Sequence, residues 1–270
     1  MNAMLKAAAY QMIDLCTAGR GIRRTIGGES IRFPARWSRW YRSDYEPNTF
    51  AFLRRYCAPG SVAMDIGAHL GLFTVVMSRL VGPQGRVFTF EPTPLSRRVL
   101  SDVVHLNACD QNVNVRGEAV ADRTGEATFY DTGNIASNAN SLVCTQRTQG
   151  NITIATISLD DLVASERATI GSRAITCLKV DVEGAELNLL AGAQQTVRND
   201  RPAIALSVHP ESIADGGRSL SELWAMIDDL RYDAHFLESY GTAKTKVAGV
   251  DMDWFCAQND MFDVGLLPRS

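Results

Sequence analysis

A buried strand that breaks into a glycine-rich turn and then a helix is the feature that most constrains this chain. Residues 62–74 have this form, because apolar residues lead to Asp65 and are followed by Gly67 and Gly71. Glycine removes the Cβ atom that would keep a ligand away from the backbone. A helix that begins near Gly71 points its free N–H groups at the same place. This order of elements predicts a nucleotide-binding turn at the end of the first sheet strand.

Two acids indicate which nucleotide fits. Asp65, at the end of the first strand, would repel a pyrophosphate but would hold an ammonium or sulfonium group, which favours S-adenosylmethionine over NAD. The second strand, residues 87–90, ends at Glu91-Pro92, and an acid there can accept hydrogen bonds from both ribose hydroxyls. Dinucleotide enzymes place an acid similarly, so Glu91 alone does not separate the two cofactors. The glycine turn, Asp65 and Glu91 together predict a nucleotide-binding site.

Charge and cysteine usage exclude some classes of partner. The 270 residues carry 27 basic and 30 acidic side chains, a net charge of −3, which gives no general attraction to nucleic acid or anionic lipid. Six cysteines are scattered singly with no CxxC pair, so the sequence suggests neither a zinc site nor a disulfide framework. We therefore expect a cytoplasmic protein that binds no nucleic acid.

The N-terminal region differs from the rest in composition. Residues 1–18 are typical of an amphipathic helix rather than an export signal, and no run of 18 apolar residues predicts a membrane span. Residues 20–42 hold seven arginines against one acid, interleaved with Phe33, Trp37, Trp40 and Tyr41. These arginines either form a solvated face whose tryptophans pack on the main domain or bind an anionic polymer. We expect residues 1–50 to form a helical extension or lid and residues 51–270 to form the enzyme domain.

From residue 61 onward, strands and helices alternate, which predicts an α/β fold with a parallel sheet covered on both faces. The expected strands are 62–66, 87–90, 113–115, 176–181, 203–208 and a last pair at 234–237 and 253–257. The expected helices are 71–80, 94–107, 183–197 and 219–230. Two further strands, 127–130 and 152–157, enclose a polar loop, 131–150, and a loop of that length is usually functional or mobile.

Several short segments resemble one known family. They are Tyr-Glu-Pro at 45–47, Ala-Pro-Gly at 58–60, the 65–74 turn, Phe-Glu-Pro-Thr-Pro at 90–94, Leu-Asp-Asp-Leu at 159–162 and the block 178–186. With these segments the chain resembles the FkbM family of S-adenosylmethionine-dependent methyltransferases. The resemblance implies a doubly wound, Rossmann-like, seven-stranded sheet whose last strand is antiparallel. It also implies methylation of a hydroxyl oxygen on a sugar or a secondary metabolite such as a glycoside or polyketide.

The resemblance also implies a set of cofactor-binding residues. Asp65, Gly67, Ala68 and Gly71 are expected at the methionine end of the cofactor and Glu91 at its ribose. The full set of expected cofactor residues is Asp65, Gly67, Ala68, His69, Gly71, Thr74, Glu91, Pro92, Glu118, Ala119 and Asp181. The family often has asparagine where this chain has His69, so the role of that side chain stays open between a ligand contact and a local hydrogen bond.

Methyl transfer to a hydroxyl needs a group that removes the hydroxyl proton. Asp181, Glu183 and His209 fall at the carboxyl ends of neighbouring strands, where reacting groups gather in a doubly wound sheet. His209 is the predicted base, because its ordinary pKa lies near neutrality. Asp181 is expected to hold the cofactor's ammonium or the acceptor hydroxyl, or else to cap the helix expected from Glu183.

The sequence leaves three alternatives to consider: a metal site, a dehydrogenase and a non-enzymatic binding module. Acids such as Glu183, Glu186, Asp160 and Asp161 could bind a divalent ion together with His209, but no His-x-x-x-His or clustered aspartate spacing marks a metal site, so we expect no required metal. An NAD-dependent dehydrogenase would share the sheet and the acid after the second strand. A non-enzymatic module would use the arginine-rich segment to bind an anionic polymer. We expect a small-molecule hydroxyl acceptor, and the sequence leaves open whether the chain forms a homo-oligomer.

Overall fold

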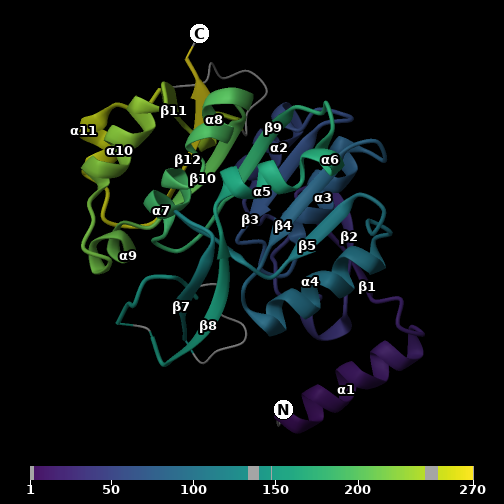
Figure 1. Ribbon diagram of the computed structural model, residues 1–270. Coiled ribbons are helices and arrows are strands. Elements are labelled where there is room, and N and C mark those ends of the chain that lie inside the picture. The colour runs from purple at the N-terminus through teal and green to yellow at the C-terminus, as the bar shows by residue number, and fades with distance from the viewer. Residues whose placement is uncertain (1–2, 133–139, 147, 241–248, 270) are drawn as a thin grey trace.

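A sheet of seven strands forms the centre of the molecule (Figure 1). The computed structural model describes residues 3–132, 140–146, 148–240 and 249–269. From one edge to the other the strands are β11 (Tyr232–Phe236), β12 (Phe262–Pro268), β10 (Ala203–Val208), β9 (Ile175–Val180), β3 (Val62–Ile66), β4 (Arg86–Phe90) and β5 (Val113–Arg116). Strand β12 is antiparallel to both β10 and β11, and β10, β9, β3, β4 and β5 run parallel. The predicted doubly wound sheet with an antiparallel last strand is confirmed.

Helices cover both faces of the sheet because successive strand residues point to opposite sides. Val62, Met64 and Ile66 of β3 belong to one hydrophobic cluster, whereas Ala63 belongs to the other. The first cluster includes α5 (Leu159–Ser165), α6 (Arg167–Ile170), α7 (Glu186–Ala191), α8 (Gln194–Asp200), α9 (Pro210–Asp215), α10 (Leu220–Asp229) and α11 (Met252–Cys256). The second includes α2 (Pro47–Tyr56), α3 (Leu72–Val81) and α4 (Pro94–Leu106). Nearly continuous apolar strands are therefore buried on both sides.

The N-terminal region is only partly helical. Helix α1 (Ala3–Cys16) extends away from the sheet (Figure 1), and η1 (Ala35–Trp37) is a short 3-10 turn. Between them, β1 (Ile22–Ile26) and β2 (Glu29–Phe33) form an antiparallel hairpin through Gly27-Gly28, whose φ angles are 55° and 83°. Glycine is suited to these left-handed positions. The hairpin's buried Ile26 and Ile31 belong to the same cluster as α2–α4. The expected helical extension or lid is therefore corrected to a helix followed by a hairpin.

Of the last two expected strands, 234–237 and 253–257, the structure contains only the first, as part of β11. Residues 253–257 form helix α11 rather than a strand, and the partner of β11 is β12. The Asp251 side chain accepts a hydrogen bond from the backbone N–H of Trp254 at 2.9 Å, which is the contact of an N-cap. Trp254 and Phe255 pack on the hydrophobic core from this helix. Aromatic residues are also common in strands, which explains the incorrect prediction.

The helix expected over residues 183–197 is two helices. Helix α7 begins at Glu186 and ends at Ala191, and α8 follows from Gln194. A Cβ atom at Gly192, between them, would overlap the carbonyl oxygen of Ala121, so the chain passes close to a neighbouring loop at that point. Because α7 begins at Glu186, Asp181 does not cap a helix from Glu183.

A small second sheet lies beside the main one. It consists of β6 (Ala119–Val120), β8 (Gly150–Ile157) and β7 (Gly125–Asp131). Strands β7 and β8 form the pair expected around the polar loop, and the stretches 133–139 and 147 of that loop lie outside the described residues. A second 3-10 turn, η2 (Leu237–Tyr240), follows β11.

Candidate active site

A cavity lies at the carboxyl ends of β3, β4 and β9, with an empty volume of about 840 Å³ when the open solvent at its mouth is included. Ligands bind at this edge in doubly wound sheets, where loops from neighbouring strands meet. Eight of the residues expected to bind cofactor line it, namely Gly67, Ala68, His69, Glu91, Pro92, Glu118, Ala119 and Asp181. Three do not, namely Asp65, Gly71 and Thr74. The structure therefore brings most of the predicted cofactor set to one cavity.

Asp65 lies behind the cavity wall, with 1% of its surface exposed. Its Oδ2 atom accepts a 2.6 Å hydrogen bond from the hydroxyl of Thr74, and its buried Oδ1 atom has no partner among the described residues. Burial raises the pKa of Asp65, and the ammonium of Lys179 on the neighbouring strand opposes that shift. The sequence predicts that Asp65 and Thr74 contact the cofactor directly, but their buried positions do not favour such a contact. Their hydrogen bond joins the end of β3 to α3.

The glycine turn is shaped by a close approach of two strands. Gly67 has a φ of 82°, and a Cβ atom there would overlap the carbonyl oxygen of Asp181 after β9. The N–H groups of Gly67 and Ala68 donate to the carbonyl of Phe90 at 3.1 and 3.0 Å. Gly71, with a φ of 84°, precedes α3 and packs near Leu100 rather than at the cavity. Gly67 therefore fixes the relative positions of three strand ends.

Glu91 is a buried carboxylate on the cavity wall, with 6% of its surface exposed. Its Oε2 accepts from the N–H of His69, and its Oε1 accepts from the N–H of Thr93, both at 2.9 Å. Burial raises the pKa of Glu91 to about 7, although these hydrogen bonds and Arg97 oppose the shift. Each carboxylate oxygen keeps a second lone pair, so the side chain can still accept from a ligand.

His69 is held in a strained turn at the cavity. Its φ is 48°, and its ring lies edge-on to Trp40 with centroids 5.5 Å apart. The Nδ1 atom is 3.4 Å from the hydroxyl of Tyr41, and the buried Nε2 atom has no partner among the described residues. Burial lowers the pKa of His69 to about 4, so the ring is neutral near pH 7. Sequence left open whether this side chain meets a ligand, and its position on the cavity wall allows that contact.

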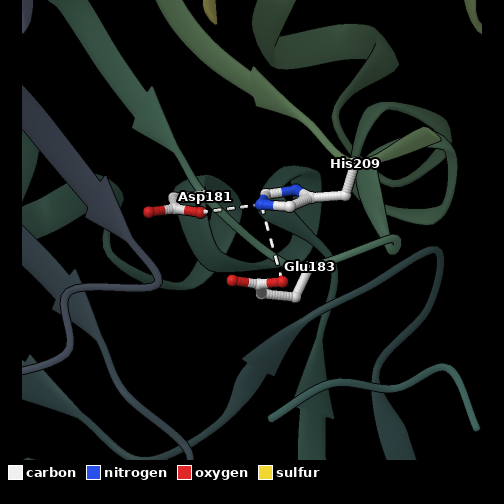
Figure 2. A group of neighbouring side chains, drawn as sticks. All are labelled: Asp181, Glu183 and His209. Atoms are coloured by element: carbon white, nitrogen blue, oxygen red, sulfur yellow. Dashed lines mark ion pairs between the residues drawn. The ribbon is translucent and has the colours of Figure 1, made fainter. Parts of the chain in front are cut away.

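His209 meets three carboxylates beside the cavity. Figure 2 shows two of them, those of Asp181 and Glu183. Its Nδ1 lies 2.8 Å from Oε1 of Glu186, and its Nε2 lies 3.6 Å from Oδ1 of Asp181 and 3.5 Å from Oε2 of Glu183. We call Asp181, Glu183, Glu186 and His209 the His209 cluster. Burial opposes protonation, but Glu186, Glu183 and Asp181 raise the pKa of His209 to about 9. A neutral imidazole that acts as base near pH 7 is therefore not favoured by this cluster.

Asp181 connects the cluster to the cavity. Asp181 lines the cavity and its side chain is 21% exposed, whereas His209 and Glu183 do not line the cavity. Its Oδ2 atom accepts from the Nζ atom of Lys179 at 3.3 Å. Burial raises the pKa of Asp181, but the charges of Lys179 and His209 outweigh it, so the net shift is downward. The carboxylate is thus ionised where a ligand can reach it.

Sequence reasoning missed Lys179 and two tyrosines. Lys179 is 4% exposed and lies 5.3 Å from the ring centre of Phe73. Burial lowers the pKa of Lys179, but Asp181 and Asp65 outweigh this effect and leave the net shift upward. The sequence did contain an indication of this residue, because Lys179 is a lone lysine within an apolar strand, two residues before an acid. Tyr41 and Tyr45 also line the cavity. They lie in the region expected to form an extension or lid, but neither side chain is among the residues expected at the site.

The fold and the cavity together define a class of enzyme. A doubly wound sheet with an antiparallel last strand, a glycine turn after β3 and an acid after β4 are the features of S-adenosylmethionine-dependent methyltransferases. The sequence model described as the methyltransferase FkbM domain matches residues 65–234, more than half of the chain. The chain belongs to the FkbM methyltransferase family. This assignment confirms the resemblance and decides against the dehydrogenase alternative.

Two curated proteins and one solved structure show the range of relatives. The chain is 28% identical over 199 residues to the 31-O-demethyl-FK506 methyltransferase FkbM of Streptomyces tacrolimicus, a match that covers 63% of this chain and 71% of that enzyme. It is 28% identical over 183 residues to the AMB antimetabolite synthetase AmbE of Pseudomonas aeruginosa, covering 56% of this chain but 8% of the synthetase. A crystal structure of methyltransferase FkbM from Methylobacillus flagellatus superposes with a TM-score of 0.38 at 21% identity, covering 55% of this chain and 33% of the other.

The residues at the cavity fit the family's cofactor. Glu91 offers carboxylate oxygens for ribose hydroxyls, and His69, whose buried Nε2 has no partner among the described residues, lines the same space. Gly67 also lines the cavity, and the acids near it suit a cationic group. No helix among the described residues is long and apolar enough to cross a membrane.

Proposed function

We propose that this protein transfers a methyl group from S-adenosylmethionine to a hydroxyl oxygen of a sugar or secondary metabolite, such as a glycoside or polyketide. The observation that carries the proposal is the His209 cluster at the cavity edge, because removal of a hydroxyl proton needs ionised acceptors close to the reacting oxygen. The name of the Streptomyces relative, a 31-O-demethyl-FK506 methyltransferase, supports transfer to oxygen.

The cofactor-binding side of the cavity is formed by the ends of β3 and β4. We propose that Glu91 binds the ribose hydroxyls and that Gly67, Ala68 and Asp181 surround the methionine end. Glu118 and Ala119 lie at the same cavity and suit the adenine. When bound, S-adenosylmethionine supplies a methyl group on a positively charged sulfur. The chain's own contribution there is to bind and orient the cofactor.

We propose that Asp181 is the catalytic residue at the acceptor and that Glu183 and His209 act through it. Asp181 lines the cavity and is the carboxylate that meets the acceptor hydroxyl, and Glu183 stands behind it. His209 points Nδ1 at Glu186 and Nε2 at both carboxylates, so it positions them rather than facing the cavity itself. The hydroxyl proton leaves to the carboxylates as the oxygen is methylated.

The N-terminal region closes part of the cavity in this proposal. Tyr41 and Tyr45 line it, and Trp40 packs against His69. Aromatic side chains with polar tips suit the faces and hydroxyls of sugars and polyketides.

All six cysteines are free, which supports the reducing, cytoplasmic compartment predicted from sequence.

The experiment that tests this function compares paired acceptors. Purified protein is incubated with S-adenosylmethionine and with glycosides and polyketides that carry free hydroxyls, each paired with its methyl ether. We expect new methyl ethers in mass spectra from the hydroxyl compounds and none from their blocked partners. Methylation of only nitrogen or carbon atoms across the panel would overturn the proposal.

Glu91 gives a prediction for the pH dependence of cofactor binding. Because its pKa is raised to about 7, the carboxylate is ionised above that pH and takes up a proton as the pH falls through it. The affinity for S-adenosylhomocysteine should be constant at high pH and weaken below pH 7 by up to about tenfold per pH unit. Calorimetry across this range measures the effect. His69, with a pKa of about 4, does not titrate in the same window.

Glu91→Gln keeps the shape of the side chain but removes its charge. We expect an affinity about 10- to 100-fold lower at high pH, the size of a lost charge-assisted hydrogen bond, and no remaining pH dependence near 7. Glu126→Gln, at an exposed site on β7, is the matched control and should bind as the native chain does. An unchanged pH profile in Glu91→Gln would contradict this role.

A further inference from the structure

We propose that Asp181, Glu183 and His209 bind a divalent transition-metal ion, with Mn²⁺ or Zn²⁺ preferred over Mg²⁺. One ligand atom from each residue lies within 4.8 Å of the other two. Figure 2 shows the imidazole nitrogen of His209 facing the two carboxylates, which come from the chain after β9. Two carboxylate oxygens and one imidazole nitrogen form a mixed donor set, which suits first-row transition ions better than Mg²⁺.

The distances within this group fit ligands of one ion better than direct hydrogen bonds. Nε2 of His209 is 3.6 Å from Oδ1 of Asp181 and 3.5 Å from Oε2 of Glu183. Hydrogen bonds between nitrogen and oxygen are shorter, at about 2.7–3.2 Å. Ligands at about 2.0–2.2 Å from a tetrahedral ion are about 3.4 Å apart. The two distances from Nε2 therefore match the edges of a coordination shell, and the third distance, between the two carboxylate oxygens, is within 4.8 Å.

Glu186 provides the outer contact that metal-binding histidines generally have. Its Oε1 accepts from Nδ1 of His209 at 2.8 Å and from the N–H of Gly184 at 3.0 Å. With Nδ1 occupied in this way, Nε2 is directed at Asp181 and Glu183. Glu186 is 0% exposed, and its Oε2 atom has no partner among the described residues. A fully buried carboxylate in this position is costly unless positive charge lies nearby.

The local charge also favours a cation. Three carboxylates, those of Asp181, Glu183 and Glu186, surround the imidazole, and Lys179 contacts the outer oxygen of Asp181 at 3.3 Å. That contact leaves Oδ1 of Asp181 directed at the group. A divalent ion would balance the excess negative charge while His209 stays neutral.

The backbone places Glu183 for this purpose. Glu183 has a φ of 51° and Gly184 a φ of 103°, both on the left-handed side. A Cβ atom at Gly184 would lie 2.6 Å from Cβ of Ser212, so the turn packs tightly beside α9. The proposal reverses the sequence-based expectation of no required metal. That expectation relied on local spacing, whereas these ligands lie at 181, 183 and 209 and meet only in the fold.

Because Asp181 lines the cavity, the ion would lie at its edge. There it would bind the acceptor's hydroxyl oxygen and lower the pKa of that hydroxyl, a role that rests on the proposed function. Binding of the ion itself does not depend on which acceptor is used.

Titration of the full chain with metal ions tests the proposal. Protein is dialysed against EDTA, then titrated with Mn²⁺, Zn²⁺ and Mg²⁺ by calorimetry, with the electron paramagnetic resonance signal of free Mn²⁺ as a second readout. We expect one saturable site per chain for Mn²⁺ and Zn²⁺, weaker binding of Mg²⁺, and a higher melting temperature with Mn²⁺ present. Absence of saturable binding would overturn the proposal.

Variants assign the site to these residues. His209→Gln and Glu183→Gln should each remove the saturable Mn²⁺ site, and Glu186→Gln should weaken it by about 10- to 100-fold. His105→Gln and Asp215→Asn, at exposed positions, are the matched controls and should bind Mn²⁺ as the native chain does. If His209→Gln does not fold, Glu183→Gln carries the test. Native affinity in a folded Glu183→Gln or His209→Gln chain would overturn the assignment.

The two proposals fail in different ways. If the EDTA-treated chain binds no Mn²⁺ yet still methylates hydroxyl acceptors, the metal site is wrong and the proposed function stands. If one Mn²⁺ binds at the expected site but no hydroxyl compound is methylated, the metal site stands and the proposed function is wrong.

Discussion

Replacement of His209 by glutamine is expected to lower kcat for methyl transfer by about 100-fold or more, with little change in affinity for S-adenosylhomocysteine. His209 contacts Asp181, Glu183 and Glu186 but does not line the cavity, so its loss disturbs the proton-accepting carboxylates and not the cofactor's contacts. Glutamine can still donate to Glu186, which keeps that buried carboxylate paired. Steady-state kinetics and calorimetry on the same preparation separate the two effects.

His105→Gln is the matched control for this substitution. The His105 side chain is 80% exposed on α4, and its loss should leave kcat unchanged. A fall in cofactor affinity equal to the fall in kcat would place His209 at the cofactor instead of the acceptor side. Native turnover by a folded His209→Gln chain would show that neither proton removal nor positioning depends on this imidazole.

The parts of the fold that follow local rules were predictable. Strand β3, the turn at Gly67 and helix α3 lie where their apolar run and glycines place them. The hairpin β1–β2 also carried a local signal in Gly27-Gly28, but its arginine-rich composition suggested a solvated extension. Helix α11 was mistaken for a strand because Trp254 and Phe255 suit either element, and the cap from Asp251 decides between them.

The candidate site likewise contains residues that the sequence predicts and residues that it does not. Residues that directly follow a strand, such as Glu91 and Asp181, reach the cavity because parallel strands end at one edge of the sheet. Asp65 also ends a strand, but its side chain turns to Thr74 beneath the wall, which spacing alone does not show. The pairing of Glu186 with His209 joins positions 23 residues apart through tertiary packing, so no sequence pattern indicates it.

The second large effect is expected from Gly67→Ala. The new Cβ atom would overlap the carbonyl oxygen of Asp181, which belongs to the backbone and cannot rotate away as a side chain would. Alanine at a φ of 82° also costs about 1–2 kcal/mol, and overpacking adds about 1–3 kcal/mol, so the free energy of unfolding should fall by about 2–5 kcal/mol. Separation of the ends of β3 and β9 should also displace Ala68 and Asp181 and abolish binding of S-adenosylhomocysteine.

Gly60→Ala separates the cost of the left-handed backbone conformation from the cost of the overlap with Asp181. Gly60 has a similar φ of 77°, but its added Cβ would have no heavy atom within 4 Å among the described residues. It should therefore lose only the backbone contribution of about 1–2 kcal/mol and bind cofactor normally. Thermal and urea unfolding of both variants, together with calorimetry, give the comparison. Equal destabilisation by the two substitutions would mean that backbone conformation alone requires Gly67. A larger loss in Gly67→Ala, together with lost cofactor binding, is the result expected if the contact between β3 and β9 shapes the cavity.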